Sequence, residues 1–261
     1  MSAATTPEQD RAALSGPRVT VIIPFHNSAA TLGATLDSLQ RQSMPHWEAV
    51  LVDDASTDES ATLVQGRAAS DPRLRLIKAS RNLGPAGARN LGISAARARF
   101  VAFLDSDDLW RPEKLAAQLP VLESGVPLVF SAYEQIDISG RVLRRVAAPD
   151  RVTYQDLLDG NPIGCLTAVW DRTFFGPVAL PLIPMHEDYA FWLTLLRHGG
   201  YGIGLPQVLA QYRIAGQSYS ARKWRAAQAV WSILRSEPGI SFPRACLGFM
   251  RYATRALARR V

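Results

Sequence analysis

Short apolar runs alternate with amphipathic segments along the first 110 residues of the chain. In residues 29–42, Leu32, Leu36 and Leu39 recur at spacings of four and three, which predicts a helix with one apolar face. Apolar runs without such spacing are typical of strands that are covered on both faces. These runs predict four strands, at residues 19–25, 47–54, 74–79 and 100–104. Strands that alternate with helices indicate an α/β fold with a mostly parallel sheet and helices on both faces.

The second half of the chain predicts a mixed continuation of this sheet. Residues 126–137 and 140–146 flank a Ser-Gly turn, so these two runs can pair as an antiparallel hairpin. The stretch 176–184 is rich in proline and is predicted to be a loop. Further predicted helices are 112–124, 153–158, 186–200, 221–235 and 242–259, and further predicted strands are 163–170 and the first part of 201–220.

Length and composition fit one large domain with short extensions. A chain of 261 residues that is 48 % hydrophobic can bury a substantial core without disulfides. Cys165 and Cys246 form no C-x-x-C pair, which favours a reducing cytoplasm and no zinc site. The N-terminus lacks the apolar stretch of a signal peptide, and no run is long and apolar enough to predict a spanning helix. The predicted parts are a disordered lead-in (1–17), a domain (18–220, divided into 18–110 and 111–220) and C-terminal helices (221–261).

Three carboxylates directly follow the apolar run 100–104. Asp105 and Asp107 are two residues apart, so an extended backbone points both side chains one way and that of Asp108 the other. Two neighbouring carboxylates repel each other unless a cation lies between them, and a hard divalent cation prefers oxygen ligands. A metal site is therefore one interpretation. The other is that Ser106 to Asp108 cap the next helix.

Polar residues also follow two of the earlier predicted strands. His26 and Asn27 end the first strand, and Asp53 and Asp54 end the second. Ligands bind beyond the carboxyl ends of parallel strands, so these groups are expected to lie near the three acids described above. Carboxylates accept hydrogen bonds from N–H and ribose hydroxyl groups, so Asp53 or Asp54 can recognise a base or a sugar. The three acids can hold a metal against a diphosphate.

A Gly-rich turn at residues 84–92 precedes the fourth predicted strand and continues as a helix. It contains neither G-x-G-x-x-G nor the GK[ST] of a P-loop, which disfavours a dinucleotide-binding fold and a P-loop NTPase. Arg89 lies just inside this helix. It is either a contact for an anion or an ordinary surface arginine.

A second acidic group begins the helix predicted over residues 186–200. Tyr189 and Trp192 share an apolar face of this helix, which leaves His186, Glu187 and Asp188 at its N-terminal end. The acids can simply complement the helix dipole, an effect of roughly 0.3–1 kcal/mol. The alternative is that one of them is a general base.

The net charge of +6 comes from 29 Lys and Arg against 23 Asp and Glu. An arginine-rich surface suits a nucleic acid, a phosphate-bearing substrate or an anionic membrane. The last predicted helix carries one stripe of arginines, which is either a solvated face or a surface attracted to anionic lipid. The residues of this stripe are Arg244, Arg251, Arg255 and Arg259.

Five segments resemble, in their order and distances, the inverting family-two glycosyltransferases with the GT-A fold. They are VTVIIPFHNSAATL, VLVDDASTD, RNLGPAGARNLG, FVAFLDSDD and HEDYAFWLTLL. With NPIGCLTAVWD and QYRIAGQSYS, they are similar to bacterial enzymes that build surface polysaccharides, over about residues 18–220. The resemblance implies transfer of a sugar, with inversion, from a nucleotide sugar such as a UDP-sugar. The implied acceptor is a hydroxyl of a growing glycan on a polyprenyl diphosphate.

The resemblance also implies roles for the matched residues. Asp188 would be the catalytic base, with Glu187 beside it, while Asp105 and Asp107 would bind ribose and Mn²⁺ or Mg²⁺. The metal would stabilise the departing nucleoside diphosphate as the base removes the acceptor proton. The residues expected to contact the nucleotide sugar are Pro24, Asn27, Asp53, Asp54, Arg89, Asp105 and Ser106.

One position departs from the family pattern, in which many relatives carry YRxH. Here Ala215 replaces the histidine, so we expect the metal to be held mainly by Asp107, diphosphate and water, with Arg213 compensating charge. A nucleotidyltransferase and a basic nucleic-acid-binding module are the alternatives. The first would carry a Gly-rich opening loop, where this chain has FHNSAAT, and the second rests on charge alone. We expect a cytoplasmic protein with no nucleic-acid partner, attached to the inner membrane face through the arginine stripe.

Overall fold

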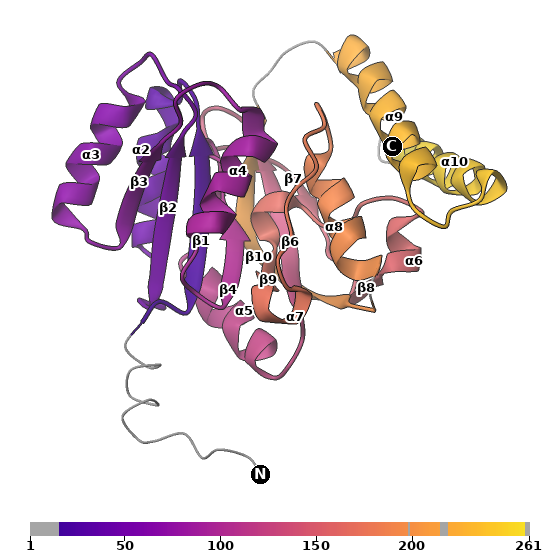
Figure 1. Ribbon diagram of the computed structural model, residues 1–261, viewed down its shortest axis with the longest axis horizontal. Helices are drawn as coiled ribbons and strands as arrows, with labels where there is room; N and C mark the ends of the chain where they lie inside the picture. Colours follow the sequence, from indigo (N-terminus) through magenta and orange to yellow (C-terminus); the bar gives the residue numbers. More distant parts are fainter. Residues whose placement is uncertain (1–15, 198, 215–218, 259–261) are drawn as a thin grey trace.

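The computed structural model in Figure 1 describes residues 16–197, 199–214 and 219–258. The strands are β1 (Val19–Phe25), β2 (Trp47–Asp53), β3 (Leu74–Lys78), β4 (Phe100–Phe103), β5 (Leu109–Trp110), β6 (Leu128–Ile136), β7 (Val142–Val146), β8 (Arg151–Thr153), β9 (Val169–Asp171) and β10 (Tyr201–Arg213). The helices are α2 (Ala29–Gln40), α3 (Ser60–Ser70), α4 (Gly84–Ala95), α5 (Lys114–Glu123), α6 (Tyr154–Leu157), the 3₁₀ helix η1 (Cys165–Thr167), α7 (Arg172–Phe175), α8 (Glu187–Arg197), α9 (Tyr219–Ser236) and α10 (Phe242–Ala258).

The strands form one sheet in the order β3-β2-β1-β4-β9-β6-β10-β5, with β7 beside β6 and β8 beside β10. Strands β3, β2, β1 and β4 are parallel to one another. Strand β9 is antiparallel to both β4 and β6, and β10 is parallel to β6, so β6 and β10 run in the same direction as the first four. The prediction of a mixed, mostly parallel sheet is therefore confirmed.

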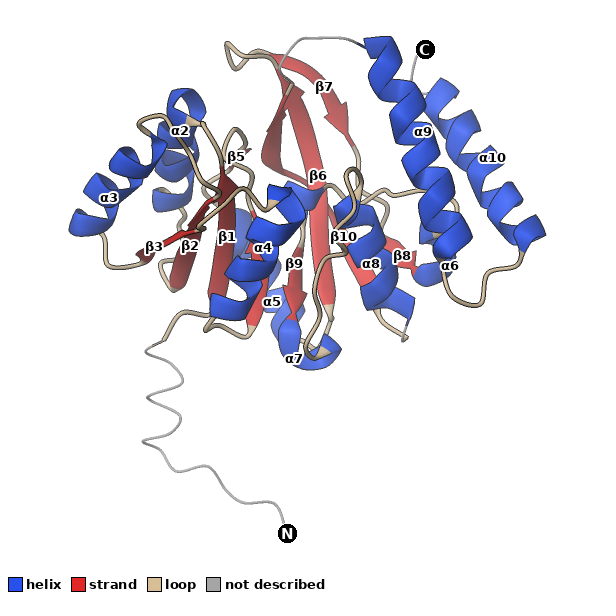
Figure 2. Ribbon diagram, turned by 45° about the horizontal axis from the view of Figure 1, so that its top comes forward, coloured by secondary structure: helices blue, strands red, loops and turns tan. Residues whose placement is uncertain are grey.

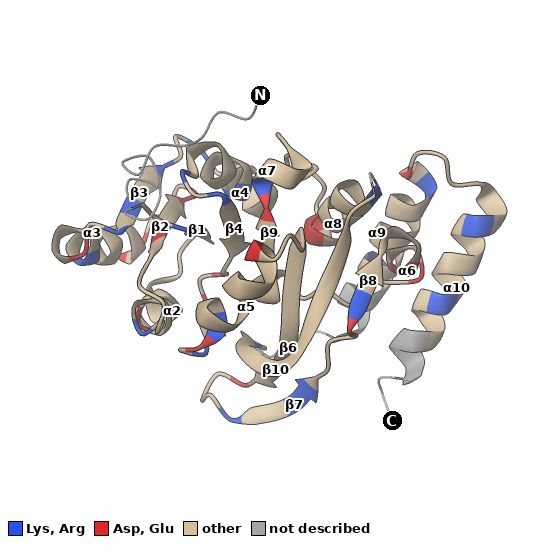
Figure 3. Ribbon diagram, turned by 90° about the horizontal axis from the view of Figure 1, so that it is seen from below, with Lys and Arg blue, Asp and Glu red and all other residues tan. Residues whose placement is uncertain are grey.

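Helices cover both faces of the sheet (Figures 2 and 3). Leu36 of α2 and Leu119 of α5 belong to the apolar core on one face, and the core on the other face includes the buried face of α8. Along β1, Val21 faces the first core and Ile22 the second. Both faces are thus shielded from water, which explains why β1 and β4 are apolar without alternation.

Helix α4 lies exceptionally close to the sheet at Gly92. A Cβ atom on Gly92 would lie 2.3 Å from Cγ2 of Ile22 in β1, a distance that real side chains do not tolerate. Glycine therefore lets the helix backbone approach the strand directly. One turn earlier on the same helix, Arg89 is buried and faces the carboxyl ends of the strands.

The predicted hairpin is confirmed, because β6 and β7 pair antiparallel. The prediction of a continuous strand at 163–170 is wrong. The chain there forms η1, in which the backbone N–H and the hydroxyl of Thr167 both donate to the carbonyl of Gly164, and pairing starts only at Val169. Two short strands, β5 and β8, and the single-turn helix α7 were not predicted, because too few residues form each of them to show a periodic pattern.

The C-terminal helices α9 and α10 pack against each other beyond α8, on the side away from β3 (Figure 1). Both are close to their predicted bounds. Arg244 and Arg251 of the predicted stripe form ion pairs with Asp159, at 3.0 and 2.5 Å. The side chain of Arg255 and all of Arg259 lie outside the described residues, as do most of the predicted lead-in and Ala215. In the described part of the chain, no helix has the length and apolar character needed to cross a membrane.

Candidate active site

The acids at 105–108 lie in a tight turn at the carboxyl end of β4. The strand ends at Phe103, and the backbone N–H of Asp108 donates to the carbonyl of Asp105 at 3.1 Å. Thr35 of α2 fixes this turn, because its hydroxyl lies 3.0 Å from the carbonyl of Ser106 and 2.9 Å from that of Asp108. Turn geometry, rather than the expected strand alternation, therefore sets where the three carboxylates point.

The helix-capping interpretation of these acids is wrong. Helix α5 begins at Lys114, and its N-cap residue Glu113 makes no side-chain capping bond. Instead, the turn is tied to the end of β10 through Arg213. The Arg213 guanidinium donates to the carbonyl of Asp107 at 2.9 Å, and its backbone N–H donates to Oδ1 of Asp108 at 2.9 Å.

A cavity of about 480 Å³ opens along the ends of β1, β2 and β4. We call it the donor cavity, after the nucleotide-sugar donor that the sequence predicts for its residues. Seven of the predicted site residues line it, which brings together groups that are up to 163 residues apart. These residues are Pro24, Asp54, Arg89, Asp105, Ser106, Asp107 and Glu187. The donor cavity thus joins three strand ends to the start of α8, as expected for ligand binding beyond the carboxyl edge of a parallel sheet.

Asn27 and Asp53 support the wall of the donor cavity and do not line it. Oδ1 of Asn27 accepts from the backbone N–H of Thr57 at 2.8 Å, and Oδ1 of Asp53 accepts from that of Ser56 at 2.9 Å. Asn27 has φ of 50° and Ala55 has φ of 61°. Non-glycine residues with positive φ cost energy and are found mainly where a site needs a particular loop shape.

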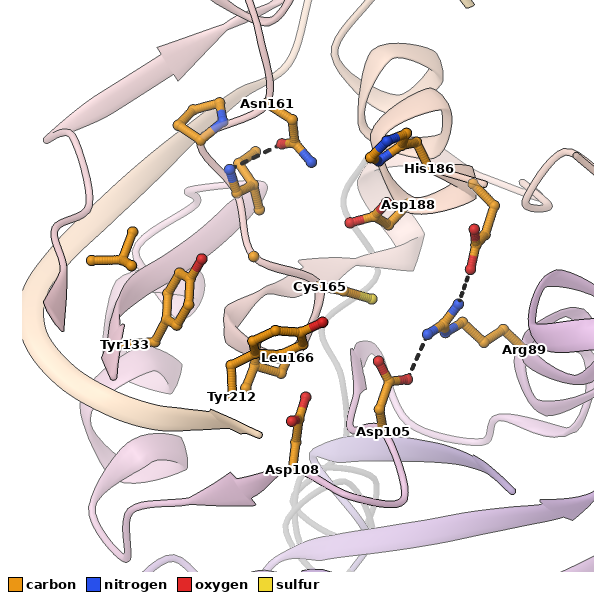
Figure 4. A pocket seen from close by; sticks show the side chains of 15 residues that line it. Arg89, Asp105, Asp108, Tyr133, Asn161, Cys165, Leu166, His186, Asp188 and Tyr212 are labelled. Carbon is orange, nitrogen blue, oxygen red and sulfur yellow. Dashed lines mark hydrogen bonds and ion pairs between the residues drawn. The ribbon is translucent and has the colours of Figure 1, made fainter. Parts of the chain in front are cut away.

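Arg89 joins the two predicted parts of the site. It donates to Oδ1 of Asp105 at 2.5 Å and to Oε1 of Glu187 at 2.6 Å (Figure 4). Its side chain is only 5 % exposed. Burial alone would lower its pKa, but the charges of Asp105 and Glu187 outweigh burial and raise it, so the guanidinium stays charged. Arg89 is thus a buried link between two carboxylates. It is neither an open contact for an anion nor a surface arginine, the two interpretations that the sequence allowed.

A second cavity, of about 320 Å³, lies on the other side of this bridge (Figure 4). We call it the acceptor cavity, because it contains Asp188, the predicted base for an acceptor hydroxyl. Arg89, Asp105 and Glu187 line both cavities. Asp188 lines only the acceptor cavity, and burial, followed by the charge of Glu187, raises its pKa above the usual value. A buried carboxylate with a raised pKa accepts protons more readily than an exposed one, which suits a general base.

The surroundings of the Asp107 carboxylate suit a divalent cation. In the described chain, no side chain donates a hydrogen bond to the Asp107 carboxylate, and burial together with the charge of Asp105 raises its pKa. A cation beside Asp107 would relieve this cost, and carboxylate oxygens are the ligands that Mn²⁺ and Mg²⁺ prefer. The described residues contain no group of three or more His, Cys, Asp or Glu side chains suited to a metal. A metal here would therefore depend on substrate oxygens or water for most of its ligands.

Several residues of the site were missed by the sequence analysis. Tyr133, Asn161 and Tyr212 line the acceptor cavity, together with Cys165 of η1. Asn161, Cys165 and Tyr212 lie in the segments NPIGCLTAVWD and QYRIAGQSYS, which the sequence analysis used for the resemblance without assigning these residues a role. Tyr133 lies in a strand that carries no motif. The PIG segment at 162–164 could have been a signal, because a Pro and a Gly beside a polar residue are typical of a shaped loop.

Comparison with known proteins places this geometry in a family. Residues 20–168 match the family described as glycosyl transferase family 2. The putative teichuronic acid biosynthesis glycosyltransferase TuaG of Bacillus subtilis is 37 % identical over 247 residues, which cover 94 % of this chain and 98 % of TuaG. The Escherichia coli UDP-Glc:alpha-D-GlcNAc-diphosphoundecaprenol beta-1,3-glucosyltransferase WfgD is 34 % identical over 83 % of this chain and 85 % of its own length.

Solved structures share the fold. Staphylococcus aureus TarS in complex with UDP-GlcNAc superimposes with a TM-score of 0.70 at 18 % identity, covering 92 % of this chain and 73 % of TarS. The mannosyltransferase PcManGT of Pyrobaculum calidifontis, with GDP-Man and Mn²⁺, gives 0.68 at 23 % identity, covering 93 % and 74 %. The expected GT-A fold is therefore confirmed. Because TuaG and WfgD also align with this chain over nearly their whole length, the chain belongs to glycosyl transferase family 2.

Proposed function

We propose that this chain transfers a sugar from a UDP-sugar, with inversion, to a hydroxyl of a lipid-linked bacterial glycan. The observation that carries the proposal is the pair of cavities on either side of Arg89, one lined by Asp105 and Asp107 and the other by Asp188. A sugar donor in one cavity and an acceptor in the other can thus approach each other from opposite sides. The names of TuaG and WfgD, and the UDP-GlcNAc bound to TarS, support this choice of substrates.

In the donor cavity, the strand ends would hold the nucleotide. Asp54 is buried, and Oδ1 of its carboxylate accepts from the backbone N–H of Leu83 at 2.7 Å, so it is oriented at the cavity wall. Asp105 and Ser106 lie beside the expected position of the ribose and diphosphate. Asp107 and Asp105 would hold Mn²⁺ or Mg²⁺, which supplies positive charge against the departing diphosphate.

In the acceptor cavity, Asp188 would remove the proton of the attacking hydroxyl. The hydroxyl oxygen forms a bond to the anomeric carbon while the bond from that carbon to the diphosphate oxygen breaks. The electron pair of the broken bond leaves with the nucleoside diphosphate, and Asp188 retains the proton. Attack from the acceptor cavity, opposite the donor cavity, inverts the anomeric centre. Glu187 is held by Arg89 and would act by orienting the start of α8.

The C-terminal helices would bring the enzyme to its lipid-linked acceptor at the inner face of the cytoplasmic membrane. Phe242, Leu247 and Met250 of α10 are 57 %, 38 % and 57 % exposed. Arg244 and Arg251 lie beside this apolar surface, and Arg251 is half exposed despite its ion pair. Basic and apolar residues side by side suit the interface of an anionic membrane.

The function can be tested by incubating the protein with UDP-, GDP- and dTDP-sugars and Mn²⁺ and measuring release of nucleoside diphosphate. We expect release from one UDP-sugar, with at least a tenfold loss of nucleotide affinity in the Asp107→Ala variant when metal is present. The proposal fails if no donor is turned over and Asp107→Ala binds nucleotide like the native protein. Release of pyrophosphate in place of a nucleoside diphosphate would indicate the nucleotidyltransferase alternative.

A further inference from the structure

The acceptor cavity has a wall of two aromatic rings that the proposed transfer chemistry does not explain. Tyr133 of β6 and Tyr212 of β10 lie on neighbouring strands, with ring centroids 6.5 Å apart and planes at 82°. Figure 4 shows both rings across the cavity from Asp188. Tyr133 lines only the acceptor cavity, whereas Tyr212 lines both cavities. Tyr212 therefore stands at the junction where the two substrates would meet.

The lining of the acceptor cavity also contains polar groups without partners in the described chain. The side-chain oxygen of Asn161 accepts from the backbone N–H of Ile163 at 2.9 Å, while its amide nitrogen has no acceptor among the described residues. Oδ2 of Asp108, beside Tyr212, and Nε2 of His186, across the cavity, are buried and have no hydrogen-bond partner within the described chain (Figure 4). Buried polar atoms are normally satisfied, so the atoms of Asp108 and His186 indicate a polar ligand or bound water.

The charge of the cavity limits what this ligand can be. Four carboxylates line it, and Arg89 is the single Lys or Arg among the described lining residues. Arg89 is itself paired with two of these acids, Asp105 and Glu187. Even with Asp108 left out of the count, three carboxylates face one guanidinium, so the lining is negative. A phosphate or carboxylate would therefore be repelled here.

We infer that the acceptor cavity binds the terminal sugar ring of the acceptor and selects a neutral ring over an acidic one. The apolar face of the ring would lie against Tyr133 and Tyr212, and Asn161 would donate to a ring hydroxyl, as in small-molecule sites with an apolar wall and a few polar groups. The diphosphate of the acceptor would stay outside the cavity. This inference rests on the proposed function, since it assumes that Asp188 faces an acceptor hydroxyl.

The test uses the full chain and matched acceptors that differ in one group. Decyl diphosphates carrying N-acetylglucosamine, N-acetylgalactosamine, glucose or galactose are each compared with the corresponding uronic acid, in which a carboxylate replaces the C6 hydroxymethyl group and nothing else changes. With the active UDP-sugar as donor, we expect transfer to at least one neutral acceptor, and at least about a hundredfold lower kcat/KM for the acidic ring of the same configuration. Equal or better use of the acidic acceptor would overturn the inference.

Variants then test the residues. Tyr133→Ala and Asn161→Ala are each expected to raise the acceptor KM about tenfold or more. Phe174 is exposed on α7 and lines neither cavity, so Phe174→Ala should leave the acceptor KM within about twofold. UDP affinity measured by calorimetry should not change in any of them. If Tyr133→Ala and Asn161→Ala leave the acceptor KM unchanged, the inference is wrong although the transferase function stands. If the native protein binds no nucleotide, the proposed function itself fails.

Discussion

Arg89 and Glu187 are 98 residues apart in sequence, and their side chains meet at 2.6 Å in the centre of the site. The same guanidinium contacts Asp105, so one buried residue of α4 fixes the end of β4 relative to the start of α8. Breaking a buried ion pair by removing one partner costs about 3–5 kcal/mol, because the other charge is left uncompensated. The relative position of the two cavities therefore depends on Arg89.

Arg89→Met should lower kcat by at least tenfold. It should also destabilise the fold, which calorimetry would detect as a lower Tm. The positive charge of Arg89 lowers the pKa of Asp188, so its removal raises that pKa further above the usual value. The acidic limb of the kcat/KM profile should therefore move to higher pH. Arg89→Lys keeps the charge but cannot hold both carboxylates as a fork, so kcat should fall without this shift of the limb. If the acidic limb of Arg89→Met is not shifted, the charge of Arg89 does not influence the pKa of Asp188.

Asp188→Asn should reduce kcat by two or more orders of magnitude while UDP affinity changes less than about threefold. The amide keeps the size of the side chain but cannot accept the proton. In the native enzyme the raised pKa of Asp188 means that activity is absent while Asp188 is protonated at low pH and rises with pH through this raised value. Equal losses of kcat and UDP affinity would mean that Asp188 has a structural role.

The layers of the fold could be predicted from the sequence. Burial on both faces of the sheet requires apolar runs in the strands and regularly spaced apolar residues in the helices, and both patterns are local. The sequence was insufficient at the turn after Phe103, because Thr35 and Arg213, which fix that turn, are 70 or more positions away. Likewise, the residues around 165 are apolar enough for a strand, yet Gln118 and Lys114 of α5 both donate to the carbonyl of Thr167 and hold η1 in place. Such long-range polar contacts leave no local pattern.

Asp107→Asn should abolish most of the effect of metal on nucleotide binding. In calorimetric titrations, native protein should bind UDP at least tenfold more tightly with Mn²⁺ than with chelator, and this ratio should fall towards one in the variant. Ser106→Ala, next to it in the same turn, should keep the ratio. A native ratio of one would mean that binding needs no metal.

Gly92→Ala should destabilise the protein by about 1–3 kcal/mol, because the new methyl group would meet Ile22 and push α4 off the sheet. Since α4 carries Arg89, activity should fall as well. Gly66→Ala in α3 is a matched control, because its Cβ has no neighbour within 4 Å and its positive effect on helix propensity is up to about 1 kcal/mol. Denaturant unfolding of both variants measures the difference, and equal stabilities would contradict the close approach.

Membrane attachment through α10 can be separated from the fold by replacing exposed apolar residues. Leu247→Glu combined with Met250→Glu should reduce sedimentation with anionic liposomes by at least fivefold, because two carboxylates would enter the apolar interface and repel the lipid headgroups. Phe174→Glu serves as the control, since Phe174 is 54 % exposed on α7, far from α10 (Figure 1). Transfer to a short-chain soluble acceptor should be unchanged in the double variant. If the double variant still sediments like the native protein while Phe174→Glu does not, the membrane contact lies near α7 and not on α10.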